Sequence, residues 1–149
     1  MPTIYTIGYT KKSLEQFIRL LQEAGVEAVI DVRLRNTSQL AGFSKRDDLA
    51  FLLDEGFGLA YEHHPELAPT PEIRDAYKAG GDWPAYERAF RPLLVEREAE
   101  AVGQEILGRF ERPCLLCAEP TPERCHRRLV AEWWAEKIDP DSLKVVHLI

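Results

Sequence analysis

The chain has 149 residues, of which 45% are hydrophobic and 30% are charged, and these values are typical of one globular domain and exclude a disordered or fibrous protein. Its 25 acidic residues outnumber its 19 lysines and arginines, which gives a net charge of −6. Such a chain does not bind duplex nucleic acid through a general excess of positive charge. We therefore expect a single domain over residues 1–149.

The sequence has neither a signal peptide nor an apolar run long enough to cross a membrane, which predicts a cytoplasmic protein without a membrane partner. Its three cysteines, Cys114, Cys117 and Cys125, are an odd number. Reactive or ligand cysteines are therefore expected rather than a disulfide framework. One Asn, one Met, ten Pro, and 13 Arg against six Lys are a composition typical of a thermophilic source.

The first half of the chain alternates between predicted strands and helices. A capping box at Ser13 and a glycine at position 25 enclose a segment with apolar side chains at helical spacing, which predicts a helix. A second helix is expected after Ser44, which we assign as its cap. The predicted strands of this half cover residues 4–7, 26–32 and 59–63.

Proline and glycine divide the second half into further helices. Thr70–Pro71 opens a short helix, Asp82 caps a second, and Pro92 is expected to start a third. The expected inward-facing residues of the third are Val95, Ala99, Val102 and Ile106. Thr121–Pro122 is expected to open the final helix. The predicted strands of this half cover residues 114–118 and 144–149.

The alternation of five strands with helices predicts the fold. The crossovers between strands are long enough for right-handed βαβ units, and the central strands are apolar on both faces. The sequence therefore predicts an α/β fold, a three-layer sandwich in which a mostly parallel five-stranded sheet carries helices on both faces.

Polar residues gather at the predicted carboxyl ends of the strands. In an open parallel sheet this edge holds the ligand site, because the loops that lead into the helices meet there. We expect one concave surface to bring together Asp31, Arg33, Cys117, Glu119 and Arg127. Further polar or small residues at these strand ends are Gly8, Tyr9 and His64.

The segment from Cys117 to Arg127 carries the most specific pattern. It is predicted to run from a buried strand into the first two turns of a helix, with Cys125 about one turn inside. Unpaired N–H groups at a helix start favour an anion, and Arg124 and Arg128 add positive charge. A thiol in such surroundings has a lowered pKa. A structural interpretation is also open, in which the cysteines fill the core and the arginines pair with surface carboxylates.

Short motifs follow one another along the chain in the order Thr6–Tyr9, Asp31–Arg33, Gly42–Lys45, Pro65–Leu67, Cys117–Glu119 and Cys125–Arg127. This order resembles the DUF488 family of bacterial and archaeal proteins, a domain of unknown function. The resemblance implies a compact α/β protein and brings no established reaction. The polar residues that it implies to be shared are Asp31, Arg33, Ser44, Lys45, Glu66, Cys117, Glu119, Cys125, His126 and Arg127.

The first functional hypothesis is an enzyme that acts on a small anionic, or nucleotide-derived, substrate at the strand-end cluster. Cys117 or Cys125 is then the nucleophile, and His126 or Glu119 is the acid-base group. The sequence specifies no cofactor. The residues assigned to substrate binding are Gly8, Tyr9, Asp31, Arg33, Ser44, Lys45, His64, Glu66 and Arg127.

Two other hypotheses remain open. A non-enzymatic module would bind single-stranded nucleic acid or a protein partner through Tyr9, Tyr61, Arg33 and Arg35. A metal site would use Cys117, Cys125 and His126 with His64 or Glu119. The spacing argues against a metal, because adjacent residues on a helix point about 100° apart, so no metal ligand is predicted. The sequence leaves the oligomeric state undetermined.

Overall fold

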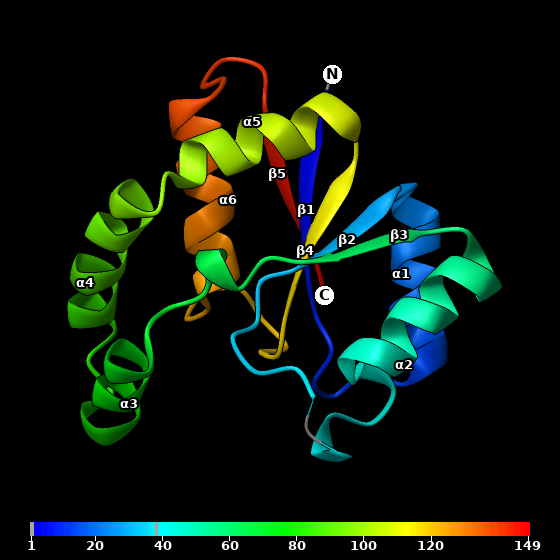
Figure 1. The fold of residues 1–149 in the computed structure, drawn as a ribbon, viewed down its shortest axis with the longest axis horizontal. Helices are drawn as coiled ribbons and strands as arrows, with labels where there is room; N and C mark the ends of the chain where they lie inside the picture. The colour runs from blue at the N-terminus through cyan, green and yellow to red at the C-terminus, as the bar shows by residue number, and fades with distance from the viewer. Residues whose placement is uncertain (1, 38) are drawn as a thin grey trace.

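A computed structural model describes residues 2–37 and 39–149. Its centre is a five-stranded sheet with the strand order β3-β2-β4-β1-β5, in which every neighbouring pair is parallel (Figure 1). The predicted strands are all present, with bounds that differ from the predicted ones by at most two residues. The strands are β1 (Thr3–Gly8), β2 (Ala28–Asp31), β3 (Ala60–His63), β4 (Pro113–Cys117) and β5 (Lys144–Leu148).

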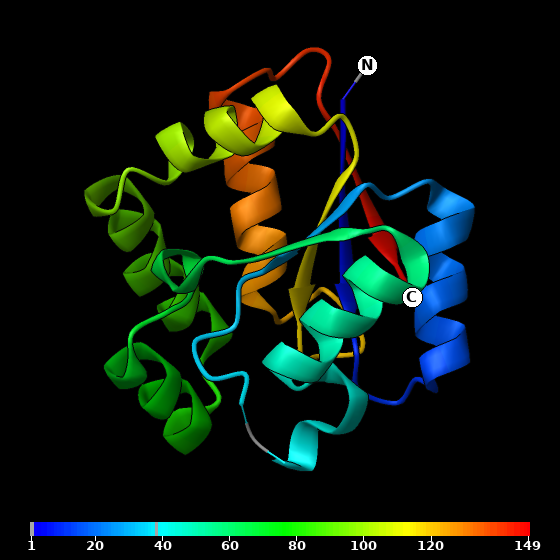
Figure 2. The same ribbon diagram turned by 45° about the vertical axis from the view of Figure 1, so that its right-hand side comes forward.

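Helices cover both faces of the sheet, which confirms the predicted three-layer sandwich (Figures 1 and 2). One face carries α1 (Leu14–Ala24) and α2 (Arg46–Phe51), which continues as a wider turn through Leu52–Gly56. The other helices, α3 (Pro71–Gly80), α4 (Trp83–Glu96), α5 (Ala99–Arg109) and α6 (His126–Lys137), lie toward the opposite face. Among them α3 packs on α4, and α4 in turn contacts α5 and α6. No helix in these described ranges is both long and apolar enough to span a bilayer.

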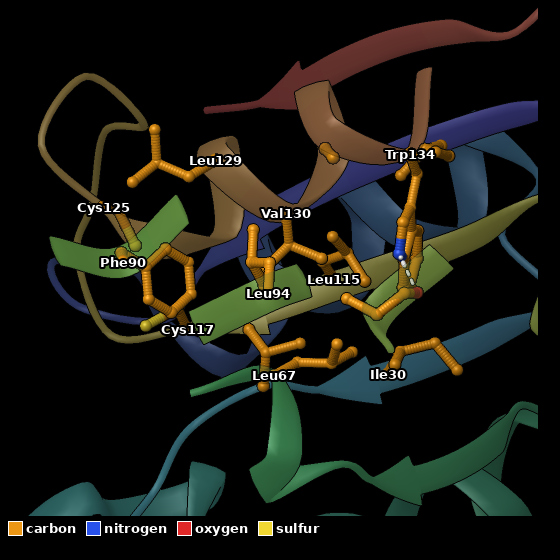
Figure 3. Packing of buried hydrophobic residues seen from close by; sticks show 14 of the residues in the cluster. Ile30, Leu67, Phe90, Leu94, Leu115, Cys117, Cys125, Leu129, Val130 and Trp134 are labelled. Atoms are coloured by element: carbon orange, nitrogen blue, oxygen red, sulfur yellow. Dashed lines mark hydrogen bonds between the residues drawn. The ribbon is translucent and has the colours of Figure 1, made fainter. Parts of the chain in front are cut away.

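The core has two halves, one on each face of the sheet. Every residue of β2 and β4 is buried, as expected for parallel strands covered on both sides. On the face of α6, Leu115 packs among Leu94, Val130 and Trp134 (Figure 3). Trp134 is fully buried and donates its indole N–H to the carbonyl of Ala99 at 2.8 Å (Figure 3).

The prediction that Pro92 starts a new helix is wrong. Pro92 lies inside α4, and Val95, expected to face inward, is 63% exposed. The apolar stripe of α4 is buried on both sides of the proline, at Phe90 and at Leu94. This packing outweighs the loss of the helix hydrogen bond that the nitrogen of Pro92 cannot donate. The chain turns only at Glu98, which has a left-handed backbone conformation and directly precedes α5. Of the expected inward positions, Ala99 and Ile106 are buried and Val102 is half-buried.

The predicted start of the final helix is also wrong. Helix α6 begins at His126, and Cys125 is its N-cap residue with an extended backbone. The preceding residues form a turn in which the N–H of Cys125 donates to the carbonyl of Pro122 at 3.2 Å. The burial of Cys125 and His126 outweighs the local preference of the Thr-Pro-Glu pattern for starting a helix. The two side chains consequently do not have the fixed angle of neighbours inside a helix.

Candidate functional site

A pocket of about 250 Å³ lies beyond the carboxyl ends of β2 and β4. These strands are neighbours, but the chain leaves β2 toward α2 on one face and leaves β4 toward α6 on the other (Figure 1). A crevice forms at such a point because the two connections diverge. Arg33, Cys117 and Glu119 line the pocket, so three of the five residues expected to converge do meet there.

The floor of the pocket contains two thiols and an imidazole. Cys117 ends β4, Cys125 caps α6, and His126 is the first residue of that helix. Their ligand-type atoms all lie within 4.8 Å of one another, and all three residues are buried. The Sγ of Cys117 lies 3.6 Å from the Nδ1 and 3.8 Å from the Nε2 of His126. In Figure 3 the two cysteines lie at one end of the core, beside Phe90.

The contact of His126 with Val32 determines which ring nitrogen carries the proton. Its Nε2 lies 2.7 Å from the carbonyl oxygen of Val32. A carbonyl only accepts hydrogen bonds, so Nε2 carries the proton and donates it. In the neutral ring Nδ1 is therefore the unprotonated nitrogen, and it is slightly the nearer of the two to the Cys117 sulfur. The ring of Phe90 packs edge-on against the imidazole, with centroids 5.9 Å apart.

The three thiols differ in their readiness to ionise. The pKa of Cys117 is lowered, chiefly because Cys125 donates a hydrogen bond to it, with help from the backbone of Ala118 and the charge of Arg127 against the effect of burial. The pKa of Cys125 is raised because its proton is held by Cys117 and because it is buried. Burial raises the pKa of Cys114. Cys117 is therefore the thiol most readily converted to a thiolate.

Arg33 is part of a closed network beside the pocket. Its Nε and Nη2 donate to the two oxygens of Asp31, both at 2.8 Å, and Nη2 also donates to the carbonyl of Ser44 at 2.7 Å. Asp31 further accepts from Asn36 at 2.9 Å and from the hydroxyl of Tyr61 at 2.5 Å. Although burial acts to raise the pKa of Asp31, these hydrogen bonds and the Arg33 charge hold it below its usual value.

This network assigns other roles to several predicted binding residues. Asp31 and Ser44 lie behind Arg33 and do not line the pocket. Lys45, not Ser44, is the residue that precedes α2, because Ser44 takes part in the network around Arg33. The guanidinium of Arg33 lies over the ring of Tyr9, 5.3 Å from its centroid.

Gly8 and Arg127 hold the loop between β4 and α6 rather than line the pocket. Arg127 is fully buried, and its Nη1 donates to the carbonyl of Glu119 at 2.7 Å. A Cβ on Gly8 would lie 1.6 Å from that same carbonyl oxygen, so only glycine permits the approach. The loop is thereby fixed close to β1, and Glu119 itself lines the pocket.

His64 and Glu66 belong to a separate cluster and do not line the pocket. The two ring nitrogens of His64 contact Glu62 at 2.9 Å and Glu66 at 2.5 Å, and Arg109 pairs with Glu62. Burial acts to lower the pKa of His64, but the two carboxylates raise it overall. This cluster extends from β3, the edge strand of the sheet.

Sequence reasoning missed an aromatic wall of the pocket. Trp83 and Tyr86 are stacked, with ring centroids 4.5 Å apart, and Tyr77 meets both edge-on at 5.5 Å. The spacing of Trp83, Tyr86 and Phe90 along α4 indicates one buried helix face, but nothing in the sequence indicates that this face meets β4. Cations also line the pocket: Arg35, Arg74, Lys78 and Arg124.

The arrangement combines a thiol, a base and a positively charged mouth in one pocket. It suits nucleophilic chemistry at sulfur or coordination of a soft metal by Cys117, Cys125 and His126. Tyr61, one of the residues of the nucleic-acid hypothesis, does not line the pocket, and its hydroxyl is bonded to Asp31.

Comparison with known proteins identifies the family of the chain. No curated protein and no solved structure matches the chain. The sequence model of the family described as "Domain of unknown function DUF488" matches residues 13–134, which include the aromatic wall, the thiols and the imidazole. The chain therefore belongs to the DUF488 family.

Proposed function

We propose that the protein is an enzyme that uses the thiol of Cys117 to act on a small anionic substrate bound in the pocket between β2 and β4. One observation carries this proposal, namely the approach of the Cys117 sulfur to the His126 ring, 3.6 Å from Nδ1 and 3.8 Å from Nε2, at the floor of a pocket with cations at its mouth. A cysteine within reach of an oriented imidazole is the usual arrangement of a thiol nucleophile.

The chemistry that fits these groups is a displacement at an electrophilic carbon. The Cys117 proton passes to His126 Nδ1, sulfur forms a bond to the carbon, and the bond to the leaving group breaks with its electron pair on that group. The leaving group takes the proton from His126. Water then displaces the sulfur, so that the sum of the steps is hydrolysis and the thiol is restored.

The remaining floor residues have supporting roles in this proposal. Cys125 donates its S–H to the thiolate of Cys117, which stabilises it. The carbonyl of Val32 orients His126. Glu119 follows the nucleophile by two residues and lines the same pocket, and we assign to it the positioning of the water.

Alkylation kinetics test the proposal. At pH 7 Cys117 should react with iodoacetate faster than free cysteine does, and its preference for iodoacetate over neutral iodoacetamide should exceed that of free cysteine by roughly tenfold, because the cations attract the anionic reagent. His126→Ala and Cys125→Ala should each slow the reaction. Cys114, fully buried in mid-strand, is the internal control and should react only after unfolding. If Cys117 also reacts only after unfolding, the proposal is wrong.

A specific observation supports a second candidate, a metal centre. Cys117, Cys125 and His126 present three soft ligands within 4.8 Å of one another, and the second ring nitrogen of His126 is anchored to a backbone carbonyl, as in many metal-binding histidines. The objection to adjacent ligands does not hold, since Cys125 precedes the helix. Elemental analysis discriminates the two candidates. About one equivalent of zinc that survives dialysis and protects both thiols from alkylation would replace the thiol proposal.

A further inference from the structure

The pocket has more positive charge than a small anion with a single negative charge requires. Arg33, which lines the pocket, pairs with Asp31. The other four lining cations, Arg35, Arg74, Lys78 and Arg124, make no ion pair within the part of the chain that the structure describes. Exposed arginines such as Arg19 and Arg109, by contrast, pair with glutamates. The Nε of Arg74 is buried and has no hydrogen-bond partner among the described residues. In a chain of net charge −6, this surplus of positive charge indicates a ligand with more than one negative charge.

The aromatic side chains of the same pocket supply a second kind of contact. Tyr9 follows β1 and Tyr77 lies on α3, and both remain half-buried where they line the pocket. Trp83 and Tyr86 are buried behind Tyr77 and fix its ring by edge-on contacts. Rigid, partly open rings beside arginines favour a planar ring system, because stacking and cation-π contacts both act on its face.

Taken together, and resting on the enzyme proposed above, these contacts lead us to infer that the substrate is a planar heteroaromatic ring that carries a phosphate, of the nucleoside monophosphate class. The ring packs against Tyr77 and Tyr9, and the phosphate binds Arg74 and its neighbouring cations. Arginine suits phosphate through paired N–H groups. The part of the substrate between ring and phosphate then lies over Cys117. A cavity of about 250 Å³ admits a single small ligand and not a folded macromolecule.

Direct binding measurements with matched ligands test the two parts of this inference, the ring contact and the phosphate contact. Calorimetry would compare AMP, GMP, CMP and UMP with their nucleosides and with ribose 5-phosphate. At least one nucleoside monophosphate should bind about tenfold or more tightly than both its nucleoside and ribose 5-phosphate, because each lacks one half of the contacts. Equal binding of the nucleoside, equal binding of ribose 5-phosphate, or no binding of any monophosphate at millimolar concentration would each overturn the inference.

Two variants test which side chain binds the phosphate and which binds the ring. Arg74→Gln should weaken monophosphate binding by roughly tenfold and leave nucleoside binding unchanged. Tyr77→Leu should weaken both by about fivefold or more. The matched controls are Arg88→Gln on the exposed side of α4 and Phe51→Leu on α2, where the side chain is 70% exposed. If the controls lower affinity as much as the pocket variants, the site lies elsewhere and the inference fails.

The ligand class and the thiol chemistry can each be refuted without the other. Cys117→Ser should still bind the monophosphate, since the thiol reacts with the substrate but does not hold it. Tight binding combined with an unreactive Cys117 would refute the thiol chemistry and retain the ligand class. A reactive Cys117 without monophosphate binding would refute the ligand class alone. A single-stranded oligonucleotide that binds far more tightly than any monophosphate would overturn the inference in favour of a nucleic-acid module.

Discussion

Two arginines are buried beside the pocket, and their surroundings differ. Arg33 is 5% exposed and donates to both carboxylate oxygens of Asp31 and to the carbonyl of Ser44. Arg127 is fully buried, and it donates to the carbonyl of Glu119. Its Nε and Nη2 have no hydrogen-bond partner within residues 2–37 and 39–149.

The difference indicates what each arginine does. Arg33 is neutralised by Asp31, so the pair forms a rigid wall with little net charge. Arg127 has no counterion among the described residues. Its charge adds to the Cys125 hydrogen bond in lowering the pKa of Cys117, and to burial in lowering the pKa of Lys12. A buried charge without a counterion is costly, and here it lies under the loop that joins the thiols. The first arginine fixes the shape of the pocket, and the second adds positive charge beneath its floor.

Removing the partner of Arg33 should have the largest effect. Asp31→Asn leaves a buried guanidinium without its counter-charge and should lower the free energy of unfolding by about 3–5 kcal/mol. Urea unfolding at pH 7 measures this loss. Asp47→Asn is the matched control, because that carboxylate is exposed and its pair with Arg46 lies on the surface, and it should cost at most about 1 kcal/mol. A loss below 1 kcal/mol for Asp31→Asn would show that the network does not hold the wall.

The same pair predicts how acid affects stability. The pKa of Asp31 is lowered in the folded protein, so its stabilisation is complete above the ordinary value of 3.8 and is lost as the pH falls through the folded pKa. The gap in stability between wild type and Asp31→Asn should therefore narrow by about 1 kcal/mol between pH 7 and pH 3, where the unfolded carboxyl is mostly protonated. Urea unfolding at both pH values measures the gap, and a constant gap would contradict the ionised pair.

The sequence predicted what depends on local pattern. The five strands follow from short apolar runs, and the meeting of Arg33 with Cys117 was expected because both stand at the carboxyl ends of parallel strands. That β2 and β4 are neighbours, which brings the two residues together, was not predicted. The start of α6 could not be predicted, since a local Thr-Pro-Glu signal competes with the burial of Cys125. The aromatic wall depends on how the α3–α4 pair packs on α5 and α6, which no local spacing encodes. The different partners of Arg33 and Arg127 likewise depend on the fold of the whole chain.

Replacing the second arginine should change reactivity more than stability. Arg127→Met removes a buried charge and keeps most of the side-chain volume, so the free energy of unfolding should change by about 1 kcal/mol or less. Alkylation of Cys117 by iodoacetate at pH 7 should slow by more than about threefold, because the charge of Arg127 is one of the contributions that lower the pKa of Cys117. Arg128→Met, which removes the next charge along α6, is the control and should change the rate by less than about threefold. A large loss of stability with an unchanged rate would reverse the roles that we assign to the two arginines.

The smallest effect is expected at His64, which forms a closed network like that of Arg33 but in a more exposed place. Its two carboxylate partners, Glu62 and Glu66, raise its pKa against the effect of burial. The stabilisation is therefore complete below the ordinary value of 6.5 and is lost as the pH rises through the folded pKa. His64→Gln should lower the free energy of unfolding by about 1 kcal/mol or less at pH 6 and by less at pH 9, since half-exposed ion pairs contribute little. Thermal unfolding at the two pH values measures the difference. A larger loss at pH 9 than at pH 6 would mean that His64 is held as a neutral ring. The difference in stability between this network and the one around Arg33 would then not be explained by exposure.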